Sequence, residues 1–327
     1  MTDCPCEPLI IIAGPTASGK TDAAVALARM IGGAVISADS QQVFRGLDIG
    51  TATPTLEECG EIEYTGIDLI AFDEQFDAAR FMTFADAELQ RHAAAGLRSI
   101  IAGGTGLYIK ALLEGLFEGP ASDPELRSEL NRRVQAEGAF ALHGELNELD
   151  PEAAAKIHHN DPARIVRALE VCRLTGRRIS ELQRESRSSE PRWPFYLFVL
   201  DWPREELYSR IDRRVTRMLD AGWLEEIKVL RGRGFNQDCP GAKALGYSTL
   251  LRHLDGELSL DEAITQIQRD SRRYAKRQLT WFRARPEAHW IPMNSDAKAE
   301  DIAHSMLCAM QKHPAVRNWE ANDQSQT

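Results

Sequence analysis

The stretch Leu9-Ile-Ile-Ile-Ala-Gly-Pro-Thr-Ala-Ser-Gly-Lys-Thr21 decides the fold of this chain. Its apolar first half predicts a buried strand, and the pattern G-x-x-x-x-G-K-T that follows is typical of a loop that binds phosphate. Gly14 and Gly19 allow the loop to bend so that backbone N–H groups point inward at anionic oxygens. Lys20 adds a positive charge where the next helix begins, and the Thr21 hydroxyl is placed to bind Mg²⁺. We therefore predict a phosphate or diphosphate site formed by Gly14, Pro15, Thr16, Ala17, Ser18, Gly19, Lys20 and Thr21.

The patterns on both sides of this loop predict an α/β layered core. Helical patterns follow Gly19 and Gly106 and cover 76–95, and they alternate with short apolar runs. We expect these runs to be buried parallel strands at Leu9–Ala13, Ala34–Ala38 and Arg98–Ala102, with Pro194–Leu200 returning to the same sheet. Amphipathic helical segments are predicted over 204–233, 243–253 and 260–285.

Residues 121–192 contain no convincing strand and predict an all-helical insertion in this core. Three predicted helices begin with an Asp as N-cap and a Pro at the first helical position, at Asp123-Pro124, Asp150-Pro151 and Asp161-Pro162. Gly176 follows the last of these helices, where a glycine is favoured. We therefore expect a core of residues 1–120 and 193–312, a helical insertion over 121–192, and a flexible polar tail over 313–327.

The charge of the chain limits the ways in which it could bind nucleic acid. A net charge of −10 argues against a nucleic-acid binder that uses its whole surface. Basic residues nevertheless gather in two segments, with eight arginines against four glutamates over Arg164–Arg192 and seven basic residues against one acid over Arg269–Arg285. Such local basic surfaces suit a polyanion that is bound at one defined place.

The sequence carries no signal of a membrane protein or of secretion. No apolar run approaches the length of about 18 residues that spans a bilayer, and the N-terminal residues lack the pattern of a signal peptide. The six cysteines have no spacing typical of a zinc site and are compatible with reduced thiols. We therefore expect a cytoplasmic protein, a monomer, without membrane contact.

Two predicted strands end in residues that suit a ligand site. Asp39 follows the second strand, beside the phosphate loop, and is a candidate Mg²⁺ ligand or general base; a turn cap is the structural alternative. The third strand ends in Ile100-Ile-Ala-Gly-Gly-Thr-Gly106, without the Asp or Glu that many phosphate-loop NTPases place there for Mg²⁺. This difference argues against ATP hydrolysis, and the glycines predict that another molecule approaches the backbone closely.

Two basic helices are candidate RNA contacts. Arg164 and Arg167, three residues apart, suit either a phosphate clamp or a solvated face with Arg–Glu pairs. On the helix predicted over 260–285, basic residues recur at helical spacing, namely Arg269, Arg272, Arg273, Lys276 and Arg277. We expect this basic face to contact the RNA backbone and Trp281 to lie in the core. The stretch Lys243-Ala-Leu-Gly-Tyr247 is equally compatible with a simple turn.

Together these residues closely resemble the tRNA dimethylallyltransferase family, the bacterial tRNA isopentenyltransferases. The matching blocks occur in the order of the family, at 14–21, 39–42, 46–52, 103–108, 157–161 with 164–170, 213–215 with 218–219, 245–247 and 274–283. The resemblance implies a P-loop NTPase-like parallel-sheet core with the helical insertion, enclosing a channel that the RNA base and the lipid diphosphate enter from opposite ends. Phe44, Thr53 and Ser248 depart from the residues common in the family and leave its chemistry intact.

The resemblance also implies a reaction and its residues. The family transfers a dimethylallyl group from dimethylallyl diphosphate to N6 of the adenosine just 3′ of the tRNA anticodon, and diphosphate is released. By resemblance, Lys20, Thr21 with Mg²⁺, and Arg214 act on the diphosphate, and Asp39 accepts a proton or hydrogen bond from N6. The implied contacts with the tRNA anticodon stem-loop, beside Lys276 and Arg277, are Asp39, Ser40, Gln41, Gln42, Thr105, Arg127, Ala163, Arg164, Ile165, Val166, Arg167, Lys243, Ala244, Leu245, Gly246, Tyr247 and Ser248.

Three other functions explain only parts of the sequence. A phosphate-loop kinase of a small metabolite explains residues 9–30 but not the basic helix or the missing acid. A prenyltransferase of free adenine nucleotides shares the chemistry but leaves the insertion without a role. An RNA-binding module without catalysis does not need Lys20, Thr21 and Asp39 together.

Overall fold

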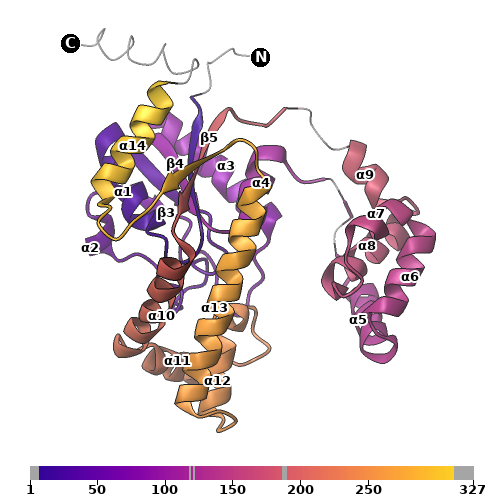
Figure 1. Ribbon diagram of the computed structural model, residues 1–327. Coiled ribbons are helices and arrows are strands. Elements are labelled where there is room, and N and C mark those ends of the chain that lie inside the picture. The colour runs from indigo at the N-terminus through magenta and orange to yellow at the C-terminus, as the bar shows by residue number, and fades with distance from the viewer. Residues whose placement is uncertain (1–6, 118, 121, 186–189, 313–327) are drawn as a thin grey trace. The chain divides into compact units, whose positions relative to one another are not determined.

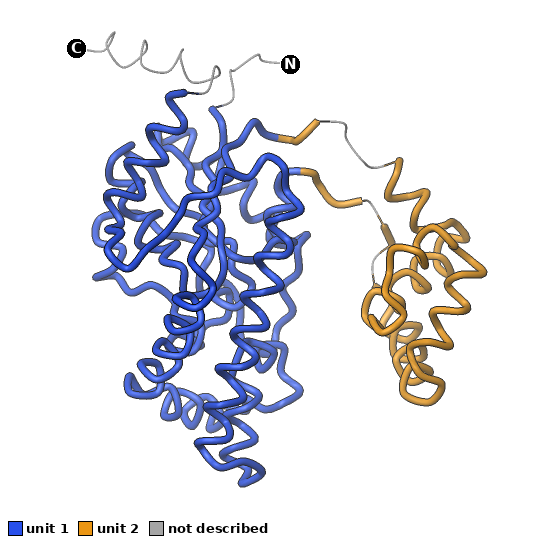
Figure 2. The backbone as a smooth tube through the Cα atoms, viewed as in Figure 1, with its two compact units in different colours: residues 1–113, 193–327 blue, residues 114–192 orange. Residues whose placement is uncertain are grey.

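The computed structural model describes residues 7–117, 119–120, 122–185 and 190–312. The chain divides into two compact units, one of Met1–Leu113 with Trp193–Thr327 and one of Glu114–Arg192 (Figure 2). We call them the core unit and the helical unit. The tail predicted over 313–327 lies outside the described residues.

The core unit is built on a six-stranded parallel sheet with the order β3-β2-β4-β1-β5-β6 (Figure 1). The strands are β1 (Leu9–Ala13), β2 (Gly33–Ser37), β3 (Tyr64–Thr65), β4 (Arg98–Gly103), β5 (Phe195–Asp201) and β6 (Ala288–Pro292). The four strands predicted from apolar runs are confirmed, and β1 and β2 are buried along their whole length. The short β3 and the partly exposed β6 were not predicted, because neither forms a continuous apolar run.

The register of the sheet brings the predicted ligand-binding segments to one edge. Ala13 at the end of β1 pairs with Gly103, and Ser37 at the end of β2 pairs with Ala102. Because β4 lies between β1 and β2, the three segments that follow these strands start side by side. This is the edge of a parallel α/β sheet at which ligands bind.

Helices pack around this sheet and extend beyond its ligand-binding edge. They are α1 (Lys20–Ile31), α2 (Leu56–Cys59), α3 (Ala78–Ala94), α4 (Gly106–Glu114), α10 (Arg204–Asp220), α11 (Trp223–Gly232), α12 (Tyr247–Leu254), α13 (Leu260–Arg283) and α14 (Ala299–Gln311), with a 3₁₀ turn at Pro240–Lys243. One apolar cluster joins the sheet to α1 and α14, and a second, around Trp223 and Tyr247, holds α11, α12 and α13 together.

Two of these helices come from a segment that the amphipathic pattern predicted as one. Gly222 adopts a left-handed conformation with φ of 98°, and it separates α10 from α11 within the predicted segment 204–233. The long helix α13 agrees closely with its predicted range because its start is well defined. Ser259 and Glu262 form a reciprocal capping box there, with Glu262 N–H donating to Ser259 Oγ and Ser259 N–H donating to the Glu262 carboxylate.

The helical unit has its own apolar core, which contains Leu130, Leu146 and Leu169. Its helices are α5 (Pro124–Glu137), α6 (Ala139–Leu149), α7 (Pro151–Lys156), α8 (Pro162–Thr175) and α9 (Ile179–Glu185). Asp123, Asp150 and Asp161 accept backbone N–H groups of the first turns of α5, α7 and α8, as the Asp-Pro pairs predicted. The predicted fold class, an α/β parallel-sheet core with an all-helical insertion, is confirmed.

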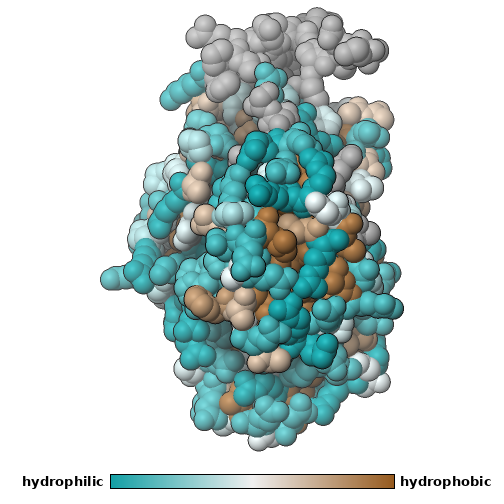
Figure 3. Space-filling model, turned by 90° about the vertical axis from the view of Figure 1, so that its right-hand side faces the viewer, coloured by the Kyte–Doolittle hydropathy of each residue, from teal (hydrophilic) through white to brown (hydrophobic). Residues whose placement is uncertain are grey.

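The surface is mostly polar. On the face drawn in Figure 3, hydrophilic residues surround a smaller area of apolar ones. Within the described ranges, no helix combines the length and the hydrophobicity needed to cross a bilayer.

Candidate diphosphate and RNA site

A cavity of about 540 Å³ lies in the core unit at the ligand-binding edge of the sheet. Its walls come from the phosphate loop, the segment after β2, residues 48–55, and helices α10 and α13. Among the lining residues are Lys20, Thr21, Asp39, Arg214 and Tyr274. The structure therefore brings together all four residues that the sequence analysis assigned to catalysis.

The backbone of the phosphate loop accepts hydrogen bonds from two side chains. The Trp202 indole N–H donates to the Ser18 carbonyl at 3.0 Å, and Arg210 Nε donates to the Ala17 carbonyl at 2.9 Å. The Arg210 guanidinium lies 4.1 Å from the centroid of the Trp202 ring, so the two donors support each other. Ala17 has a left-handed φ of 63°, which is strained for a residue other than glycine. These bonds fix the peptide planes of the loop in that strained conformation.

The loop also contains donors and acceptors suited to an anion and a cation. Ser18 is fully buried, and its hydroxyl finds no hydrogen-bond partner among the described residues. The half-buried Thr21 hydroxyl and the Asp39 carboxylate line the same cavity. Hydroxyl and carboxylate oxygens are ligands that Mg²⁺ accepts, so these residues fit the cation that the sequence predicted.

Lys20 is a cation in a desolvated position. Its Nζ donates to the Pro15 carbonyl at 2.7 Å. Burial lowers the pKa of Lys20 to about 8, while the negative charge of Asp39 acts against this shift and the positive charge of Arg214 adds to it. A bound anion would add negative charge here and favour the protonated lysine.

Asp39 caps a turn and also lines the cavity, so the structure is compatible with both of the alternatives that the sequence left open. Its Oδ1 accepts the Gln41 N–H at 2.9 Å, which is the turn-capping arrangement. Asp39 also lines the cavity and interacts electrostatically with Lys20 and Arg214. The capping bond occupies one oxygen and orients the carboxylate toward the neighbouring cations.

Helix α10 contributes more cations to the cavity than the sequence analysis proposed. Arg210, Arg214 and Arg217 all line it, at spacings of four and three residues on one face of the helix. Burial lowers the pKa of Arg214, and its guanidinium lies 3.5 Å from the Thr51 carbonyl. The spacing was a visible signal for Arg210 and Arg217, but only the fold shows that this face points at the phosphate loop.

Several of the predicted RNA contacts are linked to one another in the core unit. Ser40 N–H donates to the Thr105 hydroxyl at 2.9 Å, and Leu245 N–H donates to the Gln41 side-chain carbonyl at 2.9 Å. Gln42 is buried, and its Oε1 accepts from the Ser37 hydroxyl at 2.8 Å. The stretches 39–42, 105 and 243–248 therefore form one continuous region beside the cavity.

Some predicted contacts have side chains that the structure buries. Ile165 and Val166 pack in the core of the helical unit, and Ala244 and Tyr247 pack in the second apolar cluster of the core unit. The Tyr247 hydroxyl donates to Glu226 at 2.6 Å. In these stretches the exposed members are Ala163, Arg164 and Lys243, while Arg167, Leu245, Gly246 and Ser248 are half-buried.

The arginines of the helical unit are largely engaged in ion pairs. Arg127 and Arg167 both bind the fully buried carboxylate of Glu170 at 2.6 Å, and Arg164 lies 3.3 Å from Asp161. Burial alone would raise the pKa of Glu170, but the two guanidinium groups and the Asp123 N–H hold it below its usual value. The Arg–Glu pairing that the sequence offered as an alternative is therefore present at Arg167.

Some basic residues of α13 form ion pairs and others do not. Arg272 binds both carboxylate oxygens of Asp212 on α10 at 2.7 Å, and Arg269 and Arg273 lie near Asp270. Lys276 and Arg277 are exposed and have no ion-pair partner in the part of the chain that the structure describes. The two cations that the sequence analysis assigned to tRNA are thus free of carboxylates among the described residues, as is Arg283 at the end of the helix.

The glycines at and after the end of β4 pack closely against other parts of the protein. A Cβ on Gly103 would lie 2.2 Å from the Ala38 carbonyl oxygen, one on Gly104 would lie 2.1 Å from Gln278 Nε2, and one on Gly106 would lie 2.4 Å from Trp281. The close neighbours at these Cβ positions are parts of the protein, so packing within the protein itself already requires glycines here. Gly103 also lines the cavity, and the approach of another molecule to this backbone stays a prediction. Trp281 is half-buried against Gly106 rather than fully enclosed in the core.

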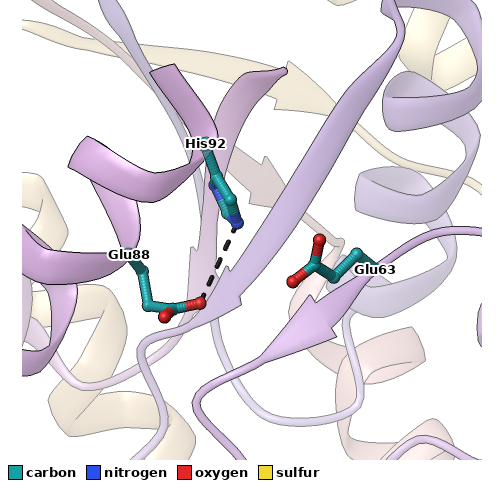
Figure 4. Close-up of side chains that lie close together, drawn as sticks. All are labelled: Glu63, Glu88 and His92. Carbon is teal, nitrogen blue, oxygen red and sulfur yellow. Dashed lines mark ion pairs between the residues drawn. The ribbon is translucent and has the colours of Figure 1, made fainter. Parts of the chain in front are cut away.

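A separate cluster of possible metal ligands is bound by an arginine. Figure 4 shows Glu63, Glu88 and His92, whose ligand atoms lie within 4.8 Å of one another. The Arg91 guanidinium binds the carboxylates of both Glu63 and Glu88, so it already supplies the positive charge that a metal would bring. Burial lowers the pKa of His92, whose Nδ1 lies 2.9 Å from the Ser99 hydroxyl.

We predict that Lys20 titrates in the free protein with a pKa of about 8, because its burial disfavours the charged form. The Cε chemical shift of ¹³C-labelled lysine, followed by NMR from pH 6 to 11, measures this value. Lys20→Arg identifies the signal by removing it, and the remaining lysines serve as internal controls. A midpoint at the ordinary value of 10.5 would contradict the desolvated position of this lysine.

The chain is similar to known proteins over most of its length. A family model described as IPP transferase matches residues 42–285. The tRNA dimethylallyltransferase of Anaeromyxobacter dehalogenans is 48% identical over 291 residues, which cover 89% of this chain and 97% of that protein. The protein of the same name from Geobacter sulfurreducens is 45% identical over 291 residues, with 88% and 94% covered.

Solved structures show the same relationship. The full-length tRNA isopentenylpyrophosphate transferase from Bacillus halodurans superimposes with a TM-score of 0.69 at 38% identity, covering 94% of this chain and 97% of that one. A eukaryotic dimethylallyltransferase described as acting on tRNA superimposes with a TM-score of 0.77 at 25% identity, covering 93% and 78%. Because the family model and these relatives span most of its length, the chain belongs to the IPP transferase family.

Proposed function

We propose that this protein transfers a dimethylallyl group from dimethylallyl diphosphate to N6 of the adenosine 3′ of the anticodon in tRNA and releases diphosphate. The observation that carries the proposal is the cavity in which the phosphate loop, Asp39 and Arg214 meet. Family membership supports the same reaction, since the matching relatives carry the name tRNA dimethylallyltransferase. A cytoplasmic location and a monomeric state stay predictions from the sequence.

The diphosphate would bind in the phosphate loop. Lys20 and Arg214 place two positive charges on the wall of the cavity, and the helix α1 directs its N-terminus toward the same point. These groups stabilise the negative charge that grows on the leaving diphosphate, which is where electrostatic catalysis is most effective. Thr21 would supply an oxygen ligand to Mg²⁺, and a bound Mg²⁺ would add positive charge to the diphosphate.

Asp39 would act on the nucleophile. The exocyclic N6 of adenosine attacks C1 of the dimethylallyl group as the bond from C1 to the diphosphate oxygen breaks. The amine then loses one proton, which Asp39 would accept. The adenosine has to leave the base stack of the anticodon loop to reach this carboxylate, as in other enzymes that modify a base.

The RNA would contact both units. In the core unit, the candidate surface consists of the region beside the cavity that contains residues 39–42, Thr105 and 243–248, together with Lys276 and Arg277. In the helical unit, the predicted contacts are Arg127 and residues 163–167, with Ala163 and Arg164 the most exposed. Recognition of a single-stranded loop by backbone and base contacts is the usual mode for RNA.

The test is a single-turnover reaction with radiolabelled dimethylallyl diphosphate and Mg²⁺, offered unmodified tRNA and AMP side by side. We expect label on the tRNA adenosine next to the anticodon. Label on AMP alone would indicate prenylation of free nucleotides instead. Label on neither would contradict the proposal and direct attention to kinase activity with ATP.

Replacing Asp39 should slow the chemical step far more than it weakens tRNA binding. We expect Asp39→Ala to lower the single-turnover rate by about 10²–10⁴-fold, which is the usual contribution of a general base. Asp73→Ala, at an exposed acid outside the cavity, is the matched control. Equal losses in rate and in tRNA affinity would show that Asp39 only binds or orients the RNA.

Neutralising Lys276 and Arg277 should weaken tRNA binding and its dependence on salt. In Lys276→Gln and Arg277→Gln, we expect the slope of log K against log salt concentration to fall by about one unit for each RNA phosphate that the variant no longer binds. Lys228→Gln, an exposed lysine paired with Glu225 on α11, controls for the change in net charge. An unchanged slope would exclude this part of α13 from the RNA interface.

A further inference from the structure

Gln278 is a buried amide on α13 that joins two segments of the site. Its Oε1 accepts the N–H of Thr16 in the phosphate loop at 2.9 Å, and its Nε2 donates to the carbonyl of Gly104 at 3.0 Å. The side chain is 6% exposed. A backbone N–H can only donate and a carbonyl can only accept, so a neutral amide in this orientation satisfies both groups.

The close packing around Gln278 depends on a glycine at residue 104. A Cβ on Gly104 would lie 2.1 Å from Gln278 Nε2 and 3.1 Å from the Gly14 carbonyl oxygen. The absence of a side chain at residue 104 therefore allows α13, the end of β4 and the start of the phosphate loop to meet at one point. A shift of α13 would have to move Thr16, because the hydrogen bond that joins them is buried.

The same turn of α13 carries the cations proposed to bind RNA. Lys276 and Arg277 immediately precede Gln278, and both are exposed while Gln278 is buried. Tyr274, one turn earlier, lines the cavity. This one helix thus presents free cations to solvent, a ring to the cavity and an amide to the phosphate loop.

We propose that Gln278 is a positioning residue that couples RNA binding on α13 to anion binding in the phosphate loop. RNA held by Lys276 and Arg277 would fix α13, and Gln278 would then hold Thr16 in the arrangement that binds diphosphate. By thermodynamic reciprocity, each ligand tightens the binding of the other by the same factor. This inference rests on the proposed function, because it needs both ligands to bind.

The experiment measures the affinity for dimethylallyl S-thiolodiphosphate, an analogue that reacts poorly, with and without a saturating anticodon stem-loop RNA. Isothermal titration calorimetry on the full chain gives the ratio of the two dissociation constants. We expect RNA to tighten analogue binding by about 5- to 150-fold in the unaltered protein, the usual range of coupling between sites. In Gln278→Met this ratio should fall to about one, while RNA affinity without the analogue stays the same.

Two further variants make the result specific. Gln268→Met is the matched control on the same helix, where the side chain is half-buried and only approaches the Asp212 carbonyl at 3.5 Å; it should keep the full ratio. Gln278→Glu retains an acceptor for Thr16 but loses the donor to Gly104, and it should also lower the ratio. If Gln278→Met does not fold, the ratio measured in Gln278→Glu tests the coupling role in its place.

The outcomes separate this inference from the proposed function. An unchanged ratio of dissociation constants in both Gln278 variants would overturn the coupling role and leave the proposed reaction in place. An equal fall of this ratio in Gln268→Met and in the Gln278 variants would do so as well. Binding of both ligands to the unaltered protein with a ratio of one would do the same. Failure of the unaltered protein to bind either ligand would contradict the proposed function, and the coupling with it.

Discussion

The site depends on how closely backbone segments approach one another after β4. Gly103 lies against the end of β2, and Gly104 lies between the phosphate loop and α13. Any side chain at these positions would overlap a carbonyl or a buried amide, so the three segments would have to separate. Because Gly103 and Gly104 have no side chains, Asp39, the phosphate loop and α13 can lie at distances where their charges interact.

The close approach of these segments also determines how strongly the charges in the site interact. Lys20 and Arg214 are desolvated beside Asp39, and charges interact more strongly in such surroundings than they do in water. Elsewhere in the described residues, most arginines bind carboxylates, as Arg272 binds Asp212 and Arg167 binds Glu170. An acidic chain can therefore present a small number of free cations at one place.

The sequence predicted the fold well wherever local signals were strong. The apolar run before Gly14, the Asp-Pro helix starts and the amphipathic segment over 260–285 all correspond to elements of the structure. The break at Gly222 was missed because the amphipathic pattern continues across it. The site residues of the phosphate loop could be named from their spacing. Gln278 could not, because a glutamine among basic residues resembles a solvated one until the register of α13 against the sheet is known.

The order of the strands has a consequence for synthesis. In the sheet, β1 is paired on one side with β4 and on the other with β5, but β5 follows the helical unit in the chain. On the ribosome, β1 therefore remains an edge strand, apolar on both faces, until the helical unit has been translated. At about 5–20 residues per second this interval lasts seconds. Because the helical unit has its own apolar core, it can fold during that time, and the nascent sheet is the species that chaperones would need to protect.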